Sequence, residues 1–260
     1  MKNIIKSQLY QLRKERLVWM VFVGFLIIPM SNIFLEGEMV LMGDYPTQVM
    51  LSEMGMLFTI FPLMFLFTLV GIMCCGDFMD KTSNYELMTG HKRAEVYFGR
   101  VIPCIIVGVI CFTVLVSVPI IVNTVMHGWG TKLDVGEIVL RHVLMIFPVF
   151  RILCTAVFAA FIIKNPYILM ALGYVTFAIG GISSSSMFEE RMSPVLGMTN
   201  LNMLSTFESW ATYGIEGNMN YIYDASLTAG QIASTIIVSL AAGAVFIYLG
   251  YVFFHTDDLN

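Results

Sequence analysis

The side chains that could carry catalysis are scattered along this sequence. The five cysteines lie inside apolar runs without a CxxC pair, and the four histidines sit in unrelated contexts, so neither set has the spacing of a metal site. An intramembrane protease would need paired glutamates with an arginine at a fixed offset and membrane histidines. Glu189 and Glu190 form a pair, but the arginine and the histidines are missing. We therefore expect no catalytic residue, no metal site and no enzymatic activity, and we interpret the cysteines as small buried apolar residues.

Nucleotide chemistry is also missing. The phosphate loop G-x-x-x-x-G-K-[ST] does not occur, and "GWGTK" at Gly128–Lys132 lacks its spacing. The net charge of −4 provides no basic face for nucleic acid. We expect this chain to bind no cofactor and no nucleic acid.

The longest polar interruption runs from Gly76 to Arg100, between apolar stretches. Asp80 can cap a short helix over Lys81–Thr89, and Gly90 suits the left-handed position that ends one. Such a polar helix fits a groove on a partner better than it anchors lipid. The alternative is a plain connector whose charges only set the topology.

Arg151 is a charge within an apolar run, about 18 Å from the inner end of the helix that would carry it. A charge near the middle of a membrane costs at least about 2.5–3.5 kcal/mol, so it should face a partner, a cavity or the protein interior. We expect Arg151 either to line a transport path or subunit interface, or to be a structural arginine bonded to carbonyls or hydroxyls. Ser183 and Ser184, in "GGISSSS", serve close helix packing or a polar outer mouth.

The composition decides which elements must position these residues. Of 260 residues, 58% are hydrophobic and 12% are charged, whereas soluble domains carry about 25% charged residues. We expect an all-α integral membrane protein with six transmembrane helices. Their approximate ranges are 17–35, 54–76, 97–126, 138–163, 166–188 and 230–254. Only Lys164 and Asn165 separate the fourth and fifth helices, which predicts a tight helical hairpin.

The distribution of Lys and Arg sets the orientation. Most of the 14 lie on one side if both termini are cytoplasmic, and only Lys132 and Arg191 lie clearly outside. Residues 77–96 then form the one long cytoplasmic loop, and residues 189–229 form a long outer loop. Arg141 lies near the outer end of the fourth helix and can reach the interface.

Two further helical segments are expected outside the spans. Residues 1–16 carry Ile5, Leu9 and Leu12 on one stripe, which predicts an amphipathic helix on the inner leaflet; a frayed basic tail is the alternative. In the outer loop, the spacing of Leu201, Leu204, Phe207 and Trp210 predicts one or two short helices near the membrane surface.

The cytoplasmic loop resembles that of the membrane (permease) subunits of type-2 ATP-binding-cassette exporters, above all Gram-positive peptide and antibiotic export or immunity permeases. Their loop reads approximately as an acid, Gly-Thr, a leucine-bearing helix, Gly-His-Ser-Arg and an aromatic residue. Here Asp77 or Asp80, Lys81-Thr82, Asn84–Met88, Gly90–Arg93 and Tyr97 stand at those places. Lys81 and Lys92 depart from the pattern. The Lys164-Asn165 turn and the closing "GYVFFHTDDLN" are similar to the family as well.

The resemblance implies a coupling helix that docks on a separate ATPase subunit. Its contact residues would be Asp80, Lys81, Thr82, Asn84, Tyr85, Glu86, Leu87, Met88, Thr89, Gly90, His91 and Arg93. It further implies two ATPase copies holding ATP and Mg²⁺, a second permease subunit, identical or paralogous, and a place in a bacterial cell membrane. The cargo would be a peptide, an antibiotic or a lipid-like molecule. The alternative function is a non-catalytic immunity or sensor protein that binds a peptide without transporting it.

Overall fold

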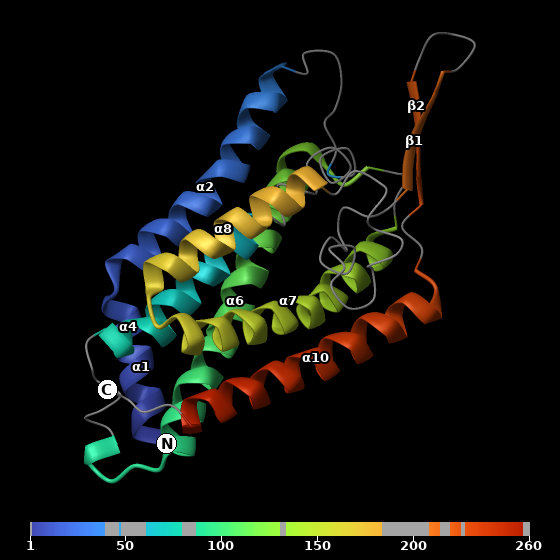
Figure 1. The fold of residues 1–260 in the computed structure, drawn as a ribbon. Coiled ribbons are helices and arrows are strands. Elements are labelled where there is room, and N and C mark those ends of the chain that lie inside the picture. The colour runs from blue at the N-terminus through green and yellow to red at the C-terminus, as the bar shows by residue number, and fades with distance from the viewer. Residues whose placement is uncertain are drawn as a thin grey trace.

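The computed structural model describes residues 2–39, 47, 61–79, 87–130, 134–183, 208–213, 219–224 and 227–256. The remaining residues, among them 80–86 and Ser184, lie outside the described part. The helices run in alternating directions along the bundle (Figure 1). The first helices are α1 (Lys2–Lys14) and α2 (Arg16–Met39), followed by a helical stretch at 61–70 that continues as η1 (Gly71–Cys75) and α4 (Gly76–Met79). Then come α6 (Arg93–His127), α7 (Val135–Ile163), α8 (Pro166–Ser183), the strands β1 (Glu208–Tyr213) and β2 (Met219–Asp224), and α10 (Ala229–Thr256).

Three of the described helices, α6, α7 and α10, are long and apolar enough to cross a membrane. Shorter apolar helical stretches occur at Arg16–Ser31, Phe61–Cys75 and Pro166–Val175. The prediction of a helical membrane protein is therefore supported, and each predicted span coincides at least in part with an observed helix. The third helix begins at Arg93 rather than at 97, because a polar first turn with Glu95 precedes its apolar part.

The turn between α7 and α8 has the tight form predicted from the sequence. Lys164 adopts a left-handed conformation (φ 54°), and its N–H donates to the carbonyl of Ala160 at 2.9 Å, which ends α7. The Asn165 side-chain oxygen then accepts from the N–H groups of Tyr167 and Ile168 at 3.0 and 3.3 Å. With Asn as the cap and Pro166 at the first helical position, α8 starts where local sequence alone requires it.

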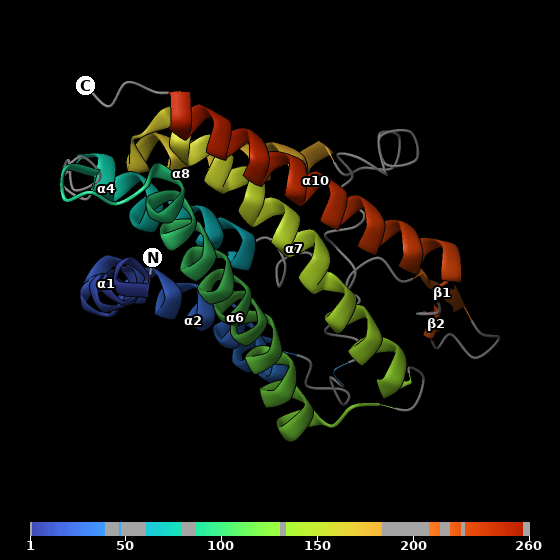
Figure 2. The same ribbon diagram turned by 90° about the horizontal axis from the view of Figure 1, so that it is seen from below.

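Helix α10 packs along α7 over much of its length (Figures 1 and 2). Its buried face carries small residues, and at Gly243 the ring of Phe150 comes so close that an added Cβ would lie 2.5 Å from its Cε1. Lipid offers no hydrophobic driving force between helices, so close packing of a ring on a glycine backbone, as here, contributes to their association.

The helix at 61–79 contains one turn of π-helix, η1. Its first residue, Gly71, lies so near the start of α8 that an added Cβ would meet the carbonyl oxygen of Pro166 at 3.2 Å. Met73, Cys74 and Cys75 of this turn are buried in the core, and Ile72 is partly buried. Single π-turns within helices often mark functional positions.

The N-terminal segment is helical as predicted, but its buried face differs from the predicted stripe. Ile4, Gln8 and Leu12 are buried, whereas Leu9 is 42% exposed. Ile4 packs against the backbone of α6 at Gly99, where an added Cβ would lie 2.9 Å away. The contact with α6 therefore determines which face of α1 is buried, and this face includes the polar residue Gln8.

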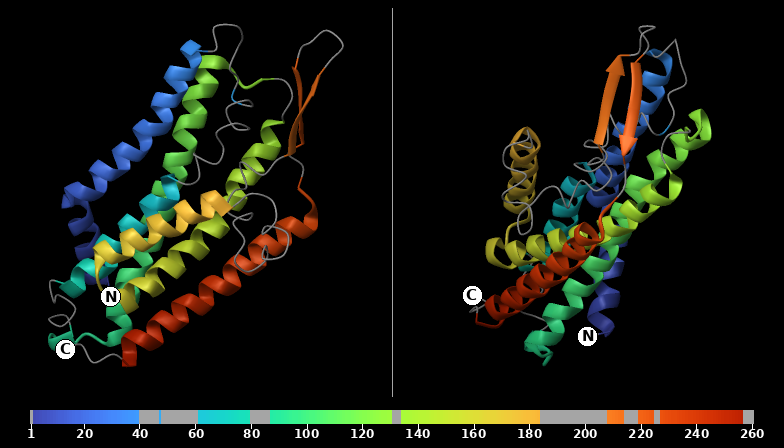
Figure 3. Two further views of the ribbon diagram at one scale, coloured as in Figure 1. Left: turned by 45° about the horizontal axis from the view of Figure 1, so that its top comes forward. Right: turned by 90° about the vertical axis from the view of Figure 1, so that its right-hand side faces the viewer.

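The prediction of helices in the outer loop is wrong for Trp210. This residue lies in β1, opposite Ile222 of β2, in an antiparallel two-stranded ribbon (Figure 3). Both strands, ESWATY and MNYIYD, are rich in aromatic and β-branched residues, which favour strands, and the sequence GIEGN between them has the glycines of a hairpin. Leu201, Leu204 and Phe207 lie outside the described residues.

Replacing Gly243 by Ala should destabilise the α10–α7 contact, because the new methyl group would collide with the Phe150 ring. Overpacking of this kind costs about 1–3 kcal/mol, and the melting temperature of the purified protein in detergent should fall accordingly. Gly24→Ala is the matched control, since nothing lies within 4 Å of a Cβ at that mid-helix position. Equal melting temperatures for the two variants would contradict the close packing.

Candidate functional site

The polar segment between α4 and α6 is the predicted contact site, and the structure describes its second half. Leu87, Met88, Thr89, Gly90, His91 and Arg93 lie in the described part; Asp80, Lys81, Thr82, Asn84, Tyr85 and Glu86 do not. The site is therefore built from its flanks, the end of α4 and the segment from Leu87 into α6.

A helix ends within this segment, at the glycine predicted to end it. Leu87 and Met88 are helical, the N–H of Gly90 donates to the Leu87 carbonyl at 3.1 Å, and Gly90 has φ +91°. A positive φ is available to glycine without strain, and most other residues would resist it. Leu87 packs on the core, whereas the side chain of Met88 is 82% exposed. The turn thus anchors one apolar side chain and presents the next.

The start of α6 is polar and reachable from outside. Lys92 caps the helix with an extended conformation, and its carbonyl accepts from the N–H of Glu95 at 2.9 Å. His91 Nδ1 lies 3.6 Å from Glu95 Oε2, with both side chains partly exposed. Glu95 in the first turn also suits the positive end of the helix dipole.

Arg93 joins the end of this segment to the end of α10. Its guanidinium Nη1 donates to the carbonyl of His255 at 2.6 Å and approaches that of Phe254 at 3.4 Å. The last carbonyls of a helix have no partner within the helix, and a cation there also matches the negative end of its dipole. The arginine that enters α6 therefore caps the C-terminus of α10.

Tyr97, one turn further along α6, is completely buried and makes the second link to α10. Its hydroxyl donates to the carbonyl of Ile247 at 2.8 Å. The hydroxyl fits beside Gly250, where an added Cβ would lie only 2.6 Å from it. Glycine at this position is what allows the tyrosine to reach the backbone.

Four rings from four elements meet around this point, and we call them the aromatic cluster: Phe78 of α4, Tyr97 of α6, Phe161 of α7 and Phe254 of α10. Phe78 lies 5.6 Å from Phe161 and 6.3 Å from Phe254 between ring centroids. Tyr97 lies 4.8 Å from Phe161 and 5.9 Å from Phe254, and Phe161 lies 5.4 Å from Phe254. Edge and tilted ring pairs at these distances contribute about 0.5–1.5 kcal/mol each beyond their buried area.

Both flanks of the polar segment are thus fixed to the same cluster. Phe78 precedes the segment, and Arg93 and Tyr97 follow it, while Lys164 of the α7–α8 turn lies 5.9 Å above the Phe78 ring. A force on the segment would be transmitted to the ends of α7 and α10 together. The arrangement can therefore transmit a movement of the polar segment to these helix ends. Among its described side chains, no nucleophile lies beside a base.

The predicted charge in the membrane, Arg151, is buried, with 6% of its side chain exposed. This burial agrees with the expectation that Arg151 faces a partner, a cavity or the protein interior; its role in a transport path or subunit interface stays a prediction. Ser183 is the last residue of α8, and Ser184 lies outside the described residues.

Two other arginines are buried as well, and one of them, Arg141, is predicted from the sequence to reach the interface. Arg100 is fully buried and Arg141 is 2% exposed. The prediction that Arg141 reaches the interface is wrong, because its helix face turns toward the protein. Beside it in sequence, the ring Nε2 of His142 lies 3.0 Å from the hydroxyl of Ser117 on α6, so this part of α7 makes polar contacts inside the bundle.

The five cysteines are buried and free, in agreement with their interpretation as small apolar residues. Three of them, Cys74, Cys75 and Cys154, lie near enough to Cys104 to interact with it electrostatically. Across the described residues, no three His, Cys, Asp or Glu side chains are arranged to hold a metal ion.

Sequence reasoning identified Tyr97 through the family pattern, but it missed Phe78, Phe161 and Phe254. Each of these lies near the end of an apolar run, where aromatic residues are common for reasons of membrane anchoring alone. Their convergence depends on how four helices pack, and no local signal distinguishes it from an aromatic belt.

A comparison with models of protein families found no match for this chain, and a comparison with curated proteins found none either.

The Arg93 link should be measurable as protection of the end of α10. Arg93→Met keeps the apolar stem but removes the donor, and a hydrogen bond from a charged group contributes about 1.5–3 kcal/mol. Amide hydrogen exchange in residues 253–256 should therefore accelerate by roughly ten- to a hundredfold. Lys92→Met removes the neighbouring exposed cation and should leave that exchange unchanged. If both variants behave alike, the cap is not what holds this helix end.

Proposed function

We propose that this chain is the six-span membrane subunit of an ATP-binding-cassette transporter, worked by a separate ATPase that docks on residues 77–96. The observation that supports this best is the joining of both flanks of that segment to the ends of α7 and α10. Phe78 on one side and Tyr97 on the other pack on the rings of Phe161 and Phe254, and Arg93 binds the carbonyl of His255. A docking element needs such a rigid connection if a partner's movement is to reach the membrane helices.

The arrangement of the helices is compatible with six spans and both termini on one side. Ile4 near the start of α1 packs on Gly99, and His255 at the end of α10 binds Arg93, so α1 begins and α10 ends beside the start of α6. The polar segment emerges at this same end (Figure 1). With Lys and Arg concentrated there, we assign this end to the cytoplasm.

The partners follow from what the sequence lacks. Without a phosphate loop of its own, the chain depends on ATPase subunits, two in number, that hold ATP and Mg²⁺. A second permease chain, identical or paralogous, completes the pathway in a bacterial cell membrane. The family resemblance favours export of a peptide, an antibiotic or a lipid-like molecule.

Within this proposal, Arg151 lines the pathway or the subunit interface, with Ser183 and Ser184 toward its outer mouth. Arg151→Gln should reduce transport-coupled ATP hydrolysis in the assembled complex while the chain still inserts and assembles. Normal hydrolysis and normal assembly in this variant would leave Arg151 a structural residue.

The docking role is tested at Met88, an apolar side chain of the segment that is 82% exposed. The tagged chain, purified from its native cell, should carry an ATPase that photolabels with azido-ATP, whereas the chain alone hydrolyses no ATP. Met88→Asp places a charge in the contact, and the co-purified ATPase should fall by about tenfold or more, as for a central contact residue.

Met126→Asp is the matched control, because Met126 is also exposed but lies at the opposite end of α6. It should leave the bound ATPase unchanged. If the wild-type chain carries no ATPase, or if Met88→Asp retains it fully, the docking assignment is wrong and the peptide-binding alternative gains support.

A further inference from the structure

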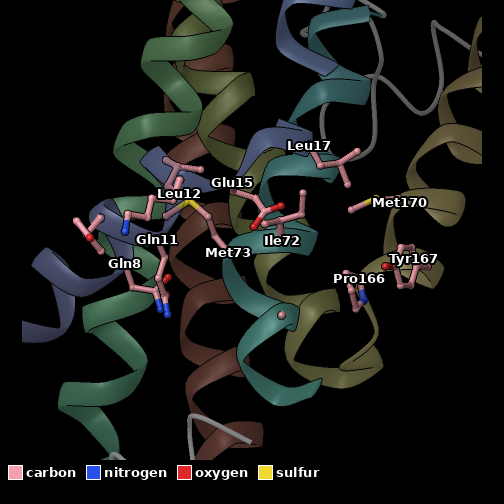
Figure 4. A pocket seen from close by; sticks show the side chains of 13 residues that line it. Gln8, Gln11, Leu12, Glu15, Leu17, Ile72, Met73, Pro166, Tyr167 and Met170 are labelled. Carbon is pink, nitrogen blue, oxygen red and sulfur yellow. The ribbon is translucent and has the colours of Figure 1, made fainter. Parts of the chain in front are cut away.

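A cavity of about 450 Å³ opens between the α1–α2 bend, the π-turn η1 and the start of α8 (Figure 4). The residues lining it are partly polar and partly apolar: Gln8, Tyr10, Gln11, Leu12, Lys14, Glu15, Leu17, Ile72, Met73, Gly76, Pro166, Tyr167 and Met170. It lies apart from the aromatic cluster, and neither the coupling segment nor Arg151 lines it.

The walls of this cavity are held in place by the chain itself. Glu15 stands between α1 and α2, and its N–H donates to the carbonyls of Gln11 and Leu12 at 3.0 and 3.2 Å. The indole N–H of Trp19 reaches back to the Leu12 carbonyl at 3.1 Å and fixes the bend. On the opposite wall, the close approach of Gly71 to Pro166 holds η1 against α8.

Charges of both signs stand at the cavity. Figure 4 shows the Glu15 side chain directed toward the wall formed by η1. Among the described residues, no cationic side chain lies within salt-bridge distance of its carboxylate. Lys14 is held with its Nζ 4.5 Å from the centre of the Tyr10 ring, and the Gln11 amide adds a neutral donor. A ligand that brings an ammonium and an anionic group together would complement this pair.

The surroundings favour a lipid over a water-soluble ligand. The exposed side chains of Leu17 and Tyr167 flank the cavity, and amphipathic tyrosines are typical of the membrane interface. Helices α2 and α8, which lead away from it, carry exposed apolar residues such as Met20 and Leu172. Acyl chains could follow these surfaces while the headgroup stays in the cavity.

We propose that this cavity binds the headgroup of an aminophospholipid such as phosphatidylethanolamine. Glu15 accepts hydrogen bonds from the primary ammonium, and Lys14 with Gln11 donates to the phosphate. A primary ammonium has three N–H donors, whereas a choline group has none and is normally recognised by an aromatic cage. The Tyr10 ring is already covered by Lys14, and a purely anionic headgroup would leave Glu15 without a partner.

The direct test is lipid retention by the purified wild-type chain, measured by native mass spectrometry after exchange into detergent with defined lipids. Phosphatidylethanolamine should be retained about tenfold better than phosphatidylglycerol or phosphatidylcholine, as expected for one hydrogen bond between charged groups. Retention should fall stepwise from phosphatidylethanolamine through its mono- and dimethylated forms, because each methyl group removes a donor. Equal retention across this series would overturn the proposal without any variant.

A variant pair locates the site. Glu15→Gln has nearly the same shape on an exposed side chain, and it should abolish the preference for phosphatidylethanolamine. Glu137→Gln, at the opposite end of the bundle, should preserve it. If Glu15→Gln keeps the preference, the amine binds elsewhere and the proposal fails.

A water-soluble competitor shows whether the cavity binds the whole lipid or only its headgroup. Glycerophosphoethanolamine carries the same ammonium and phosphodiester charges without acyl chains, and at equal concentration it should displace little lipid. Full displacement would identify a water-soluble amine as the ligand and would overturn the lipid assignment.

Discussion

The hydrogen bond from the Tyr97 hydroxyl to the Ile247 carbonyl is the interaction on which the packing around the aromatic cluster depends. It ties α6 to α10, and it is possible only because Gly250 leaves room for the phenol. With the tyrosine fixed by this bond, its ring is presented to Phe161 and Phe254. In a low-dielectric interior such a bond is strong, and its loss would leave a buried hydroxyl unsatisfied. The cluster is therefore organised by one polar contact inside an apolar shell.

Local sequence accounts for much of the fold. Long apolar runs predict helices because only an internally bonded backbone is stable in lipid. Asn165 and Pro166 predict the tight turn and Gly90 predicts the end of a helix, since in each case the residue type suits its position; the left-handed conformation of Lys164 is not favoured by its residue type. These features need no knowledge of distant neighbours.

The features that could not be predicted depend on contacts between distant segments. The face of α1 is chosen by its contact with Gly99 of α6, so Gln8 is buried, while Leu9, which the apolar stripe would have placed in the contact, is exposed. Arg100 and Arg141 are buried for a similar reason: their positions on the helix, and not their charge, decide which way they point. The hairpin at Trp210 went unpredicted because helical spacing and strand composition coincide there.

The π-turn η1 changes the direction in which the side chains that follow it point from the helix axis. A π-turn accommodates one residue more than an α-turn, and each residue of an α-helix corresponds to about 100° of rotation. Residues after Cys75 are therefore rotated about the helix axis relative to those before Gly71. That rotation sets the direction of Phe78, which joins the aromatic cluster, while Ile72 and Met73 line the cavity on another side. Without the extra residue, the side chains after Cys75 would point about 100° away from their present direction, and Phe78 would be turned away from the rings of Phe161 and Phe254.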